Sequence, residues 1–311
     1  MAFGFVSLDP SPPPAGPWTV GSTGLLRRLI KGAGLVARHP ILTARVALLA
    51  LAPGLGPLWR QQPTALLRYS IPAYANGMAP ADRTEFLVRH YRRLGRFFGS
   101  QSAARIFGSG LELWSRRAEG ASLSVALEVN PPFNLEGESN LVMRIDGERI
   151  YVLSFVIGPA ERLGAGPGEA LMVTQLQGMR GTGPLVRLAT KAMSDVGPQL
   201  LLMAVAQGIA TALRVRRIVG IGAARQVCVP AAGPNGDFLS AYDQFWQSIE
   251  GERLASGDYQ FPVPIRDKPL AQIKLNHRGR VRRRRAVRTT IAAAVRRRLR
   301  AMRRDGDLAA P

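Results

Sequence analysis

Glycine and glutamine crowd one short stretch of the chain, "VTQLQGMRGTGPL", between residues 173 and 185. The glycines allow the backbone to approach a ligand closely, and Pro184 suits the first position of a helix. Exposed N–H groups at such a helix start suit phosphate or pyrophosphate, and Arg180 adds a positive charge. A plain strand-to-helix turn is the alternative, because it would use the same glycines for geometry alone. The candidate cofactor-binding residues are Gln175, Gln177, Gly178, Arg180, Gly181 and Gly183.

A second stretch with reactive side chains is "SAYDQFWQSIEGE", around residue 245. Tyr242 could act as a general acid and Asp243 as a general base. The alternative is an amphipathic helix that packs into the core, and this alternative is favoured for Phe245 and Trp246. For Tyr242 and Asp243 the sequence leaves both interpretations open.

A pair of carboxylates, Glu136 and Glu138, precedes a strand-like segment in "NLEGESNLVM". Two carboxylates close together can poise one of them for proton transfer, although such a pair more often lies in a solvated turn. The candidate catalytic residues are therefore Tyr242, Asp243 and Glu138. The three histidines and the single cysteine show no spacing typical of a metal site, so we predict no bound metal.

The elements that must position these residues follow from the periodicity of the apolar side chains. The middle of the chain contains a hairpin whose turn is Asp146-Gly147, because this dipeptide supplies the positive φ angles of a tight turn. The order of strands and helices predicts an α+β fold with a central, mostly antiparallel sheet flanked by helices. The expected elements are strands at 122–129, 140–158 (the hairpin) and 169–178, helices at 184–195 and 198–214, a strand at 217–221 and a helix at 237–249.

The chain divides by composition into four parts. Residues 1–20 are rich in proline and are expected to be disordered. Residues 21–115 form a helical segment, whose strongest helix is expected at 81–107 from the spacing of its apolar residues. Residues 116–265 form the α+β core, and residues 266–311 form an arginine-rich tail that is expected to be helical.

The charge is strongly positive, at +21, and it is concentrated in the tail. Residues 278–304 contain 13 arginines and no acidic residue, which indicates an anionic partner. Nucleic acid would be bound only non-specifically, because no recognition motif accompanies the arginines. An anionic membrane surface is favoured, because apolar residues form one narrow stripe typical of an interfacial helix. The stripe consists of Val287, Ile291, Val295, Leu299 and Met302.

We predict the compartment from the absence of export and membrane-spanning signals. One cysteine cannot form an internal disulfide, and the start of the chain lacks the pattern of a signal peptide. The longest apolar runs are shorter than the roughly 20 residues that a membrane span needs. We therefore expect a cytoplasmic protein that is peripheral at the inner membrane.

Seven short motifs, taken in order, resemble the VirK/YbjX family of Gram-negative bacteria, a domain of unknown function. They cover roughly residues 59–288, although the longer arginine-rich tail and the proline-rich start depart from the family. The resemblance implies a link to envelope integrity, virulence and resistance to antimicrobial peptides, with membrane association, and it implies no particular reaction. The motifs are "EGE", "YVLSFVIG", "QLQG", "LATKAM", "DVGPQLLLMA", "AYDQFW" and "RVRRRR".

The order of elements from the hairpin onward is similar to that of GCN5-related N-acetyltransferases. In that family a strand ending in Gln/Arg-x-x-Gly-x-Gly/Ala leads into a helix and cradles the pyrophosphate of acyl-coenzyme A. Here residues 175–178 fit the first half, whereas Arg180 stands where the family has a small residue. The resemblance implies acyl-coenzyme A as cofactor and Tyr242 as the group that reprotonates the departing thiolate. An acyltransferase and a non-enzymatic membrane-surface protein both remain as hypotheses.

Overall fold

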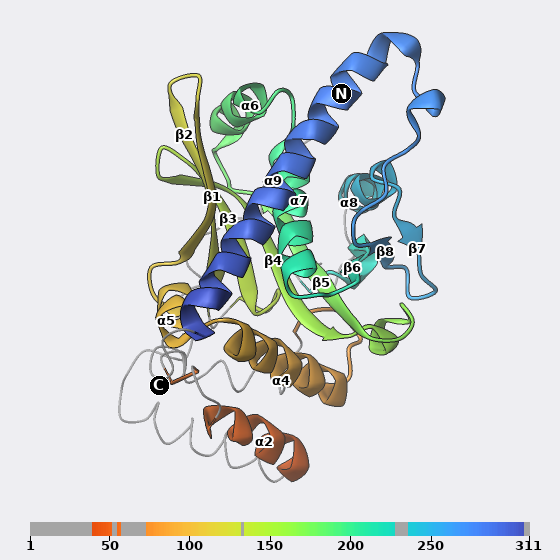
Figure 1. Cartoon of the computed structure of the whole chain (residues 1–311). Coiled ribbons are helices and arrows are strands. Elements are labelled where there is room, and N and C mark those ends of the chain that lie inside the picture. Colours follow the sequence, from red (N-terminus) through yellow and green to blue (C-terminus); the bar gives the residue numbers. More distant parts are fainter. Residues whose placement is uncertain (1–38, 52–54, 57–72, 132–133, 228–235, 308–311) are drawn as a thin grey trace.

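The computed structural model describes residues 39–51, 55–56, 73–131, 134–227 and 236–307. The expected proline-rich disordered start at residues 1–20 lies outside these described residues. Helices surround one sheet, which crosses the middle of the molecule in Figure 1.

Eight strands form the sheet in the order β1-β2-β3-β4-β5-β6-β8-β7. Neighbouring strands pair antiparallel throughout, except that β5 and β6 are parallel. The prediction of an α+β fold with a mostly antiparallel central sheet is therefore confirmed. The strands are β1 Leu111–Ala118, β2 Ala121–Val129, β3 Ser139–Ile145, β4 Glu148–Pro159, β5 Glu169–Gly178, β6 Arg217–Gly220, β7 Glu252–Arg253 and β8 Tyr259–Pro262.

The centre of the sheet is apolar on both faces, as expected for strands that helices cover. The predicted hairpin is β3 and β4, and its turn residues Asp146 and Gly147 both have positive φ angles, of 49° and 86°. In Figure 1, α7 and then α9 lie in front of the sheet, and α4 and α2 lie below it. The helices are α2 Pro40–Ala47, α4 Pro80–Phe97, α5 Ser100–Phe107, α6 Gly183–Ala192, α7 Pro198–Ala212, α8 Gly236–Ser248 and α9 Leu275–Asp307, with 3-10 turns η1 Leu48–Leu51, η3 Ala160–Leu163, η4 Ala223–Arg225 and η5 Leu270–Gln272.

The single helix predicted at 81–107 is two helices in the structure. Phe98 and Gly99 adopt extended backbone angles between α4 and α5, so the chain turns there although the apolar spacing continues. Strand β1 was not expected, and it crosses the boundary predicted at residue 115 between helical segment and core. Its sequence, "LELWSRRA", hides the strand because charged residues occupy most of its exposed positions.

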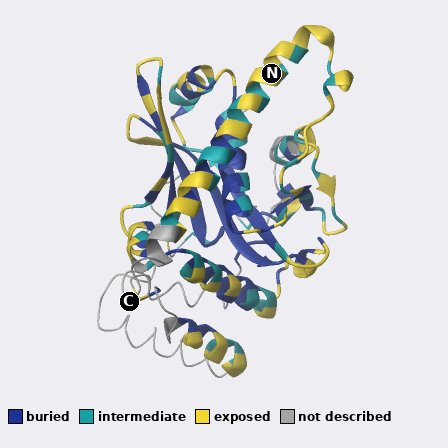
Figure 2. Cartoon of the chain, in the orientation of Figure 1, coloured by how far each residue is buried: buried dark blue, intermediate teal, exposed yellow. Residues whose placement is uncertain are grey.

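Helix α9 corrects the interpretation of the apolar stripe in the tail. Ile291, Val295 and Leu299 are buried inside the protein, against α7, and are not available to a membrane. Close approach of the two helices depends on Gly208, since a Cβ there would lie 2.7 Å from the carbonyl oxygen of Ala292. A narrow apolar stripe serves packing against a helix as well as packing against lipid. Figure 2 shows the outer side of α9 exposed along most of its length.

Within the ranges that the structure describes, none of the helices combines the length and the apolar character needed to cross a bilayer.

Candidate functional site

The parallel strands β5 and β6 pair for only four residues and then part. Their last paired residues are Val173 and Gly220, and one further bond joins the Ile221 N–H to the Val173 carbonyl, at 3.0 Å. Strand β5 continues to Gly178, whereas the chain after β6 turns away into η4. We call this place the β5–β6 divergence. Beyond it, no described strand pairs with the side of β5 that faced β6.

A β-bulge marks the same point of β5. Thr174 has no counterpart in β4, because Ser154 faces Gln175 while the next residue, Phe155, faces Val173. The Thr174 hydroxyl donates to the Ser154 carbonyl at 3.1 Å. Bulges re-aim side chains and are frequent beside functional sites. The bulge therefore changes which side chains β5 presents at the divergence.

The loop before β3 is pressed against this bulge. A Cβ on Gly137 would lie 2.9 Å from the Thr174 Oγ1 and 2.9 Å from the Phe155 backbone nitrogen, and its φ of +105° also favours glycine. The adjacent Glu138 N–H donates to the Phe155 carbonyl at 3.0 Å. The loop thus brings Glu138 to the divergence from the neighbouring end of β3.

A row of buried polar side chains crosses β3, β4 and β5 beside the bulge. The Asn130 Nδ2 donates to backbone carbonyls, including that of Gly137, so its Oδ1 accepts from the Asn140 Nδ2 at 2.9 Å. Asn140 Oδ1 then faces the Ser154 hydroxyl at 2.8 Å and takes its single hydrogen. Ser154 Oγ also lies 2.6 Å from the side-chain amide of Gln175. The structure places Gln175 Oε1 at this distance, but the single hydrogen of Ser154 is used by Asn140, so we assign the flipped amide with its Nε2 toward Ser154.

Glu138 is fully buried between two tyrosines. The Tyr74 hydroxyl donates to its Oε1 and the Tyr91 hydroxyl donates to its Oε2, each at 2.6 Å. The neighbouring Glu136 is also buried, so the interpretation of this pair as a solvated turn is wrong. Short bonds to both oxygens fix the Glu138 carboxylate firmly in place.

His90 on α4 also belongs to this buried polar region. Its Nδ1 accepts from the Ile157 N–H at 3.1 Å, so in the neutral ring the Nε2 carries the hydrogen and donates to the Ser139 hydroxyl at 3.0 Å. Strand β3 ends its pairing with β4 at Phe155, and α4 takes over the edge of β4 from there. The imidazole thereby satisfies a backbone donor that β3 no longer reaches.

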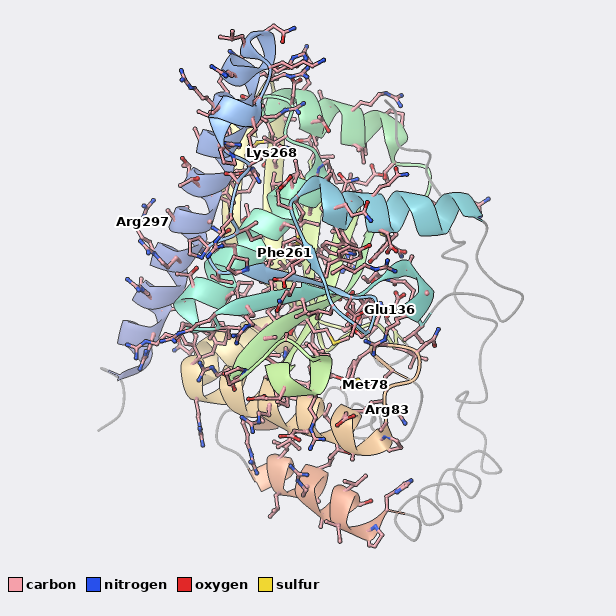
Figure 3. All side chains as sticks on the ribbon, turned by 90° about the vertical axis from the view of Figure 1, so that its right-hand side faces the viewer. Met78, Arg83, Glu136, Phe261, Lys268 and Arg297 are labelled. Carbon is pink, nitrogen blue, oxygen red and sulfur yellow. The ribbon has the colours of Figure 1, made fainter. Side chains whose placement is uncertain are left out.

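Residues 74–76, which we call the strap, join the two sides of the divergence. The Tyr74 N–H donates to the Leu135 carbonyl at 2.8 Å, on the β3 side. On the β6 side, the Asn76 N–H donates to the Arg225 carbonyl at 2.8 Å, and its Nδ2 donates to the Gln226 carbonyl at 2.6 Å. The strap lies above α4, in the part of Figure 3 that contains Glu136, Met78 and Arg83.

The loop after β6 is held by two carboxylates. Asp258 accepts from the Gly222 N–H at 3.0 Å and from the Ser256 hydroxyl at 2.9 Å, and it forms an ion pair with Arg225. Burial raises the pKa of the Asp258 carboxyl, and Arg225 opposes that rise. The Asp243 Oδ1 accepts from the Ala223 N–H at 2.8 Å, which fixes the start of η4.

A model of the family described as "Protein of unknown function (DUF535)" matches residues 35–297. The chain belongs to this family. DUF535 is the VirK/YbjX family, so the family resemblance read from the motifs is confirmed. Neither the curated proteins nor the solved structures contain a match to this DUF535 chain.

In this DUF535 chain the candidate catalytic residues lie at two ends of the strap. Glu138 is on the β3 side, while Tyr242 and Asp243 are on α8, beside η4. Tyr242 is half-buried, and its ring contacts the edge of Trp246 at a centroid distance of 5.9 Å. Trp246 is a core residue, as the amphipathic interpretation predicts. The strap therefore joins regions that the sequence offered as separate candidates.

The candidate cofactor-binding residues also fall into two groups. Gln175 belongs to the buried polar row, and Gln177 is half-buried near the end of β5, which is Gly178. Arg180 and Gly181 are exposed in the turn before α6, and Gly181 has a φ of +79°. Gly183 is the first residue of α6. The glycine-rich stretch thus forms a strand-to-helix turn, with Gln175 set back inside the sheet.

Several residues of the region could not be singled out from local motifs, because their partners are distant in sequence. Asn140 and Ser154 do carry a signal, because each is an uncharged polar residue next to an apolar run in its strand. Tyr74, His90 and Tyr91 carry no such signal and are recognised only by their contacts. Within the described ranges, no three His, Cys, Asp or Glu side chains gather closely enough to hold a metal ion.

Proposed function

We propose that this chain is an acyltransferase that uses acyl-coenzyme A as the acyl donor. The observation that carries the proposal is the β5–β6 divergence, a parallel pair that parts at a bulge and leaves the Thr174–Gly178 edge of β5 without a strand partner among the described residues. Such an edge suits an extended ligand with amide groups, because backbone N–H and C=O groups can bond to it as to a strand. The pantetheine arm of coenzyme A is a ligand of this kind.

The turn after β5 supports the same proposal. Gly181 and Gly183 lead from β5 into α6, whose first N–H groups suit the pyrophosphate of the cofactor. The exposed Arg180 adds a positive charge beside that turn. The order of strands and helices from β3 to β8 resembles that of GCN5-related N-acetyltransferases.

The reaction would be attack of an acceptor amine on the thioester carbonyl, with a C–N bond formed and the C–S bond broken. Tyr242 is the proposed proton donor to the thiolate that leaves, and the proton that the amine loses passes to solvent, from which Tyr242 is reprotonated. Glu138 takes a positioning role in this proposal, because both of its oxygens already accept hydrogen bonds, from Tyr74 and Tyr91. Asp243 positions η4 through its Oδ1, which accepts from the Ala223 N–H. Catalysis would then rest mainly on placing the two reactants together.

Calorimetric titration with coenzyme A and with acetyl-coenzyme A tests the proposal. We expect binding by the unaltered chain and a loss of about tenfold in affinity for Arg180→Glu, the size of one lost charge-assisted contact. Arg105→Glu makes the same change of charge at an exposed position of α5 and serves as the control. Absence of binding by the unaltered chain, or an equal loss in both variants, would overturn the proposal.

A second candidate function is attachment to an anionic membrane surface, in line with a cytoplasmic protein peripheral at the inner membrane and with a role in envelope integrity. The supporting observation is the outer side of α9, where Figure 3 shows Arg297 pointing away from the body. Each basic residue near an anionic surface adds about 1 kcal/mol of attraction. The same surface would bind nucleic acid non-specifically and with steep salt dependence. The exposed arginines of α9 are Arg280, Arg282, Arg283, Arg297, Arg298, Arg300 and Arg303.

Removal of the tail cannot test this second candidate, because residues of α9 belong to the core. Substitution of Arg297, Arg300 and Arg303 by glutamine keeps the helix and removes three exposed charges. We expect weaker flotation with vesicles that contain anionic lipid and no change with neutral vesicles. Unchanged flotation with anionic vesicles would reject the candidate.

A further inference from the structure

The inward side of α9 changes character along the helix. Near the middle of the helix, Ala292 is buried against Gly208 of α7. Residues four apart stay on one side of a helix, so the same side can be followed toward the N-terminus. There it carries a row of arginines instead of apolar residues. This arginine row consists of the half-buried Arg284 and Arg288 and of Arg280, which lies one turn farther along and is exposed.

The arginine row lies beside the start of α7. Helices α7 and α9 run parallel, because Arg288 lines the same small cavity as Leu200, whereas Ala292 lies farther along, against Gly208. One turn before Arg288, Arg284 interacts with Asp195, in the turn between α6 and α7. The first turns of α9 therefore extend past the N-terminus of α7, as Figure 1 shows.

Positive charge exceeds negative charge at this place. In the described part of the chain, the acidic partners of these arginines and of the adjacent Arg285 are Asp195 and Asp267. Burial lowers the pKa of the Arg284 guanidinium, the charge of Arg280 lowers it further, and Asp195 opposes both. The N-terminus of α7 has no acidic residue in its first turn and adds a partial positive charge of its own.

Buried donors in the same place lack hydrogen-bond partners. The Nε–H groups of Arg284 and Arg288 have none among the described residues, and that of Arg285 has only the ion pair with Asp267 Oδ1, at 3.6 Å. A buried donor without a partner is costly, and guanidinium groups match the oxygens of phosphate in geometry and charge. Excess charge and unmet donors together suit an oxygen-rich anion at this site.

We propose that the arginine row, together with Arg285, binds the phosphate group of a phosphorylated ligand. The N-terminus of α7 strengthens the site, because its partial charge has the same sign as the arginines. The site is separate from the glycine turn before α6 and does not depend on acyl transfer. It also differs from the outer arginines Arg282, Arg297 and Arg300, all of which are exposed, because Arg284, Arg285 and Arg288 are half-buried.

Two variants with equal charge test the proposal, with inorganic pyrophosphate as the probe. The site variant replaces Arg280, Arg284 and Arg288 by glutamine, and the outer variant replaces Arg282, Arg297 and Arg300 by glutamine. At an ionic strength of about 0.15 M, where charges are screened beyond about 8 Å, we expect the unaltered chain and the outer variant to bind pyrophosphate. The site variant should bind at least about tenfold more weakly.

Arg284→Lys provides a second test in case the triple site variant does not fold. It keeps the charge but loses the planar fork of guanidinium donors, so a severalfold loss of pyrophosphate affinity is expected with unchanged thermal unfolding in the absence of the probe. Absence of pyrophosphate binding by the unaltered chain would overturn the proposal. Equal losses in the site and outer variants, or full affinity in Arg284→Lys, would do the same.

A flotation arm with phosphatidylglycerol vesicles identifies the source of the phosphate group. If a lipid headgroup occupies the site, the site variant floats less than the outer variant although both have lost three charges. If the phosphate group belongs to a soluble ligand, the two variants float equally and only the pyrophosphate arm separates them.

Discussion

The polar row at the β5–β6 divergence and the arginine row on α9 satisfy their polar groups in opposite ways. From Ser154 through Asn140 and Asn130, each side chain donates to the next, and the chain of bonds ends on backbone carbonyls. On α9, Arg284 and its neighbours have more positive charge and more donors than their described partners can satisfy. In the first region the hydrogen bonds run between groups of the protein, whereas the second suits a bound anion.

Loss of the Glu138 carboxylate, at the β5–β6 divergence, should cause the largest fall in the free energy of unfolding. Glu138→Leu leaves the hydroxyls of Tyr74 and Tyr91 buried without this acceptor, and we expect the free energy of unfolding to fall by about 3–5 kcal/mol in urea denaturation. Glu112→Leu, at an exposed position of β1, should change it by less than about 0.5 kcal/mol. A loss below about 1 kcal/mol for Glu138→Leu would mean that the tyrosines find other partners.

The apolar half of α9 gives the next largest effect. Leu299 is fully buried, and Leu299→Ala should lower the free energy of unfolding by about 2–4 kcal/mol. Arg300→Ala, at the adjacent exposed position, should have an effect within about 0.5 kcal/mol. Comparable small effects for both would show that α9 does not pack on the core in solution.

Coupling inside the polar row should be smaller but specific. Ser154→Ala removes one buried link, and a loss of about 1–2 kcal/mol is expected. Because Gln175→Leu breaks the same chain, the double variant should lose less than the sum of the single variants, by about 0.5–1 kcal/mol. Strict additivity in a double-mutant cycle would show that the row is not one connected chain.

The pH dependence of stability that is due to Asp258 should be the smallest effect, because its hydrogen bonds and Arg225 oppose part of the rise in its pKa. Its pKa is raised in the folded state, so the folded chain binds more protons than the unfolded chain just above the ordinary pKa of aspartate. Stability due to this group therefore falls as the pH rises through that range, and it is constant at neutral pH. Unfolding curves of the unaltered chain and Asp258→Asn, compared across pH, should show this difference. A difference that grows in the opposite direction would contradict the raised pKa.

Much of the fold could be predicted because it depends on local patterns. Alternating apolar residues and the Asp146-Gly147 turn predict the hairpin of β3 and β4, and the glycines near residue 180 predict the turn into α6. Strand β1 could not be predicted, because the exposed positions of this edge strand carry charged residues that mask the alternation. The break at Gly99 was missed because the apolar spacing continues across it.

The candidate site was predictable only residue by residue. Glu138 and Gln175 stand out in their own motifs, and the structure places both near one bulge. Periodicity shows that a side of a helix is apolar but not what covers it, so the stripe of α9 was assigned to a membrane when α7 covers it. Tyr74 and His90 act across long separations that no local pattern encodes.

The strap also sets an order of events during synthesis of the chain. Tyr74 and Glu138 are 64 residues apart, and Asn76 and Gln226 are 150 residues apart. A ribosome adds roughly 5–20 residues each second, so Asn76 must wait about 8–30 seconds for its partner to emerge. Contacts with such long separation close large loops and are expected to form late. The divergence region is therefore completed only after most of the sheet exists, and the growing chain must keep the buried polar groups of the strap solvated until then.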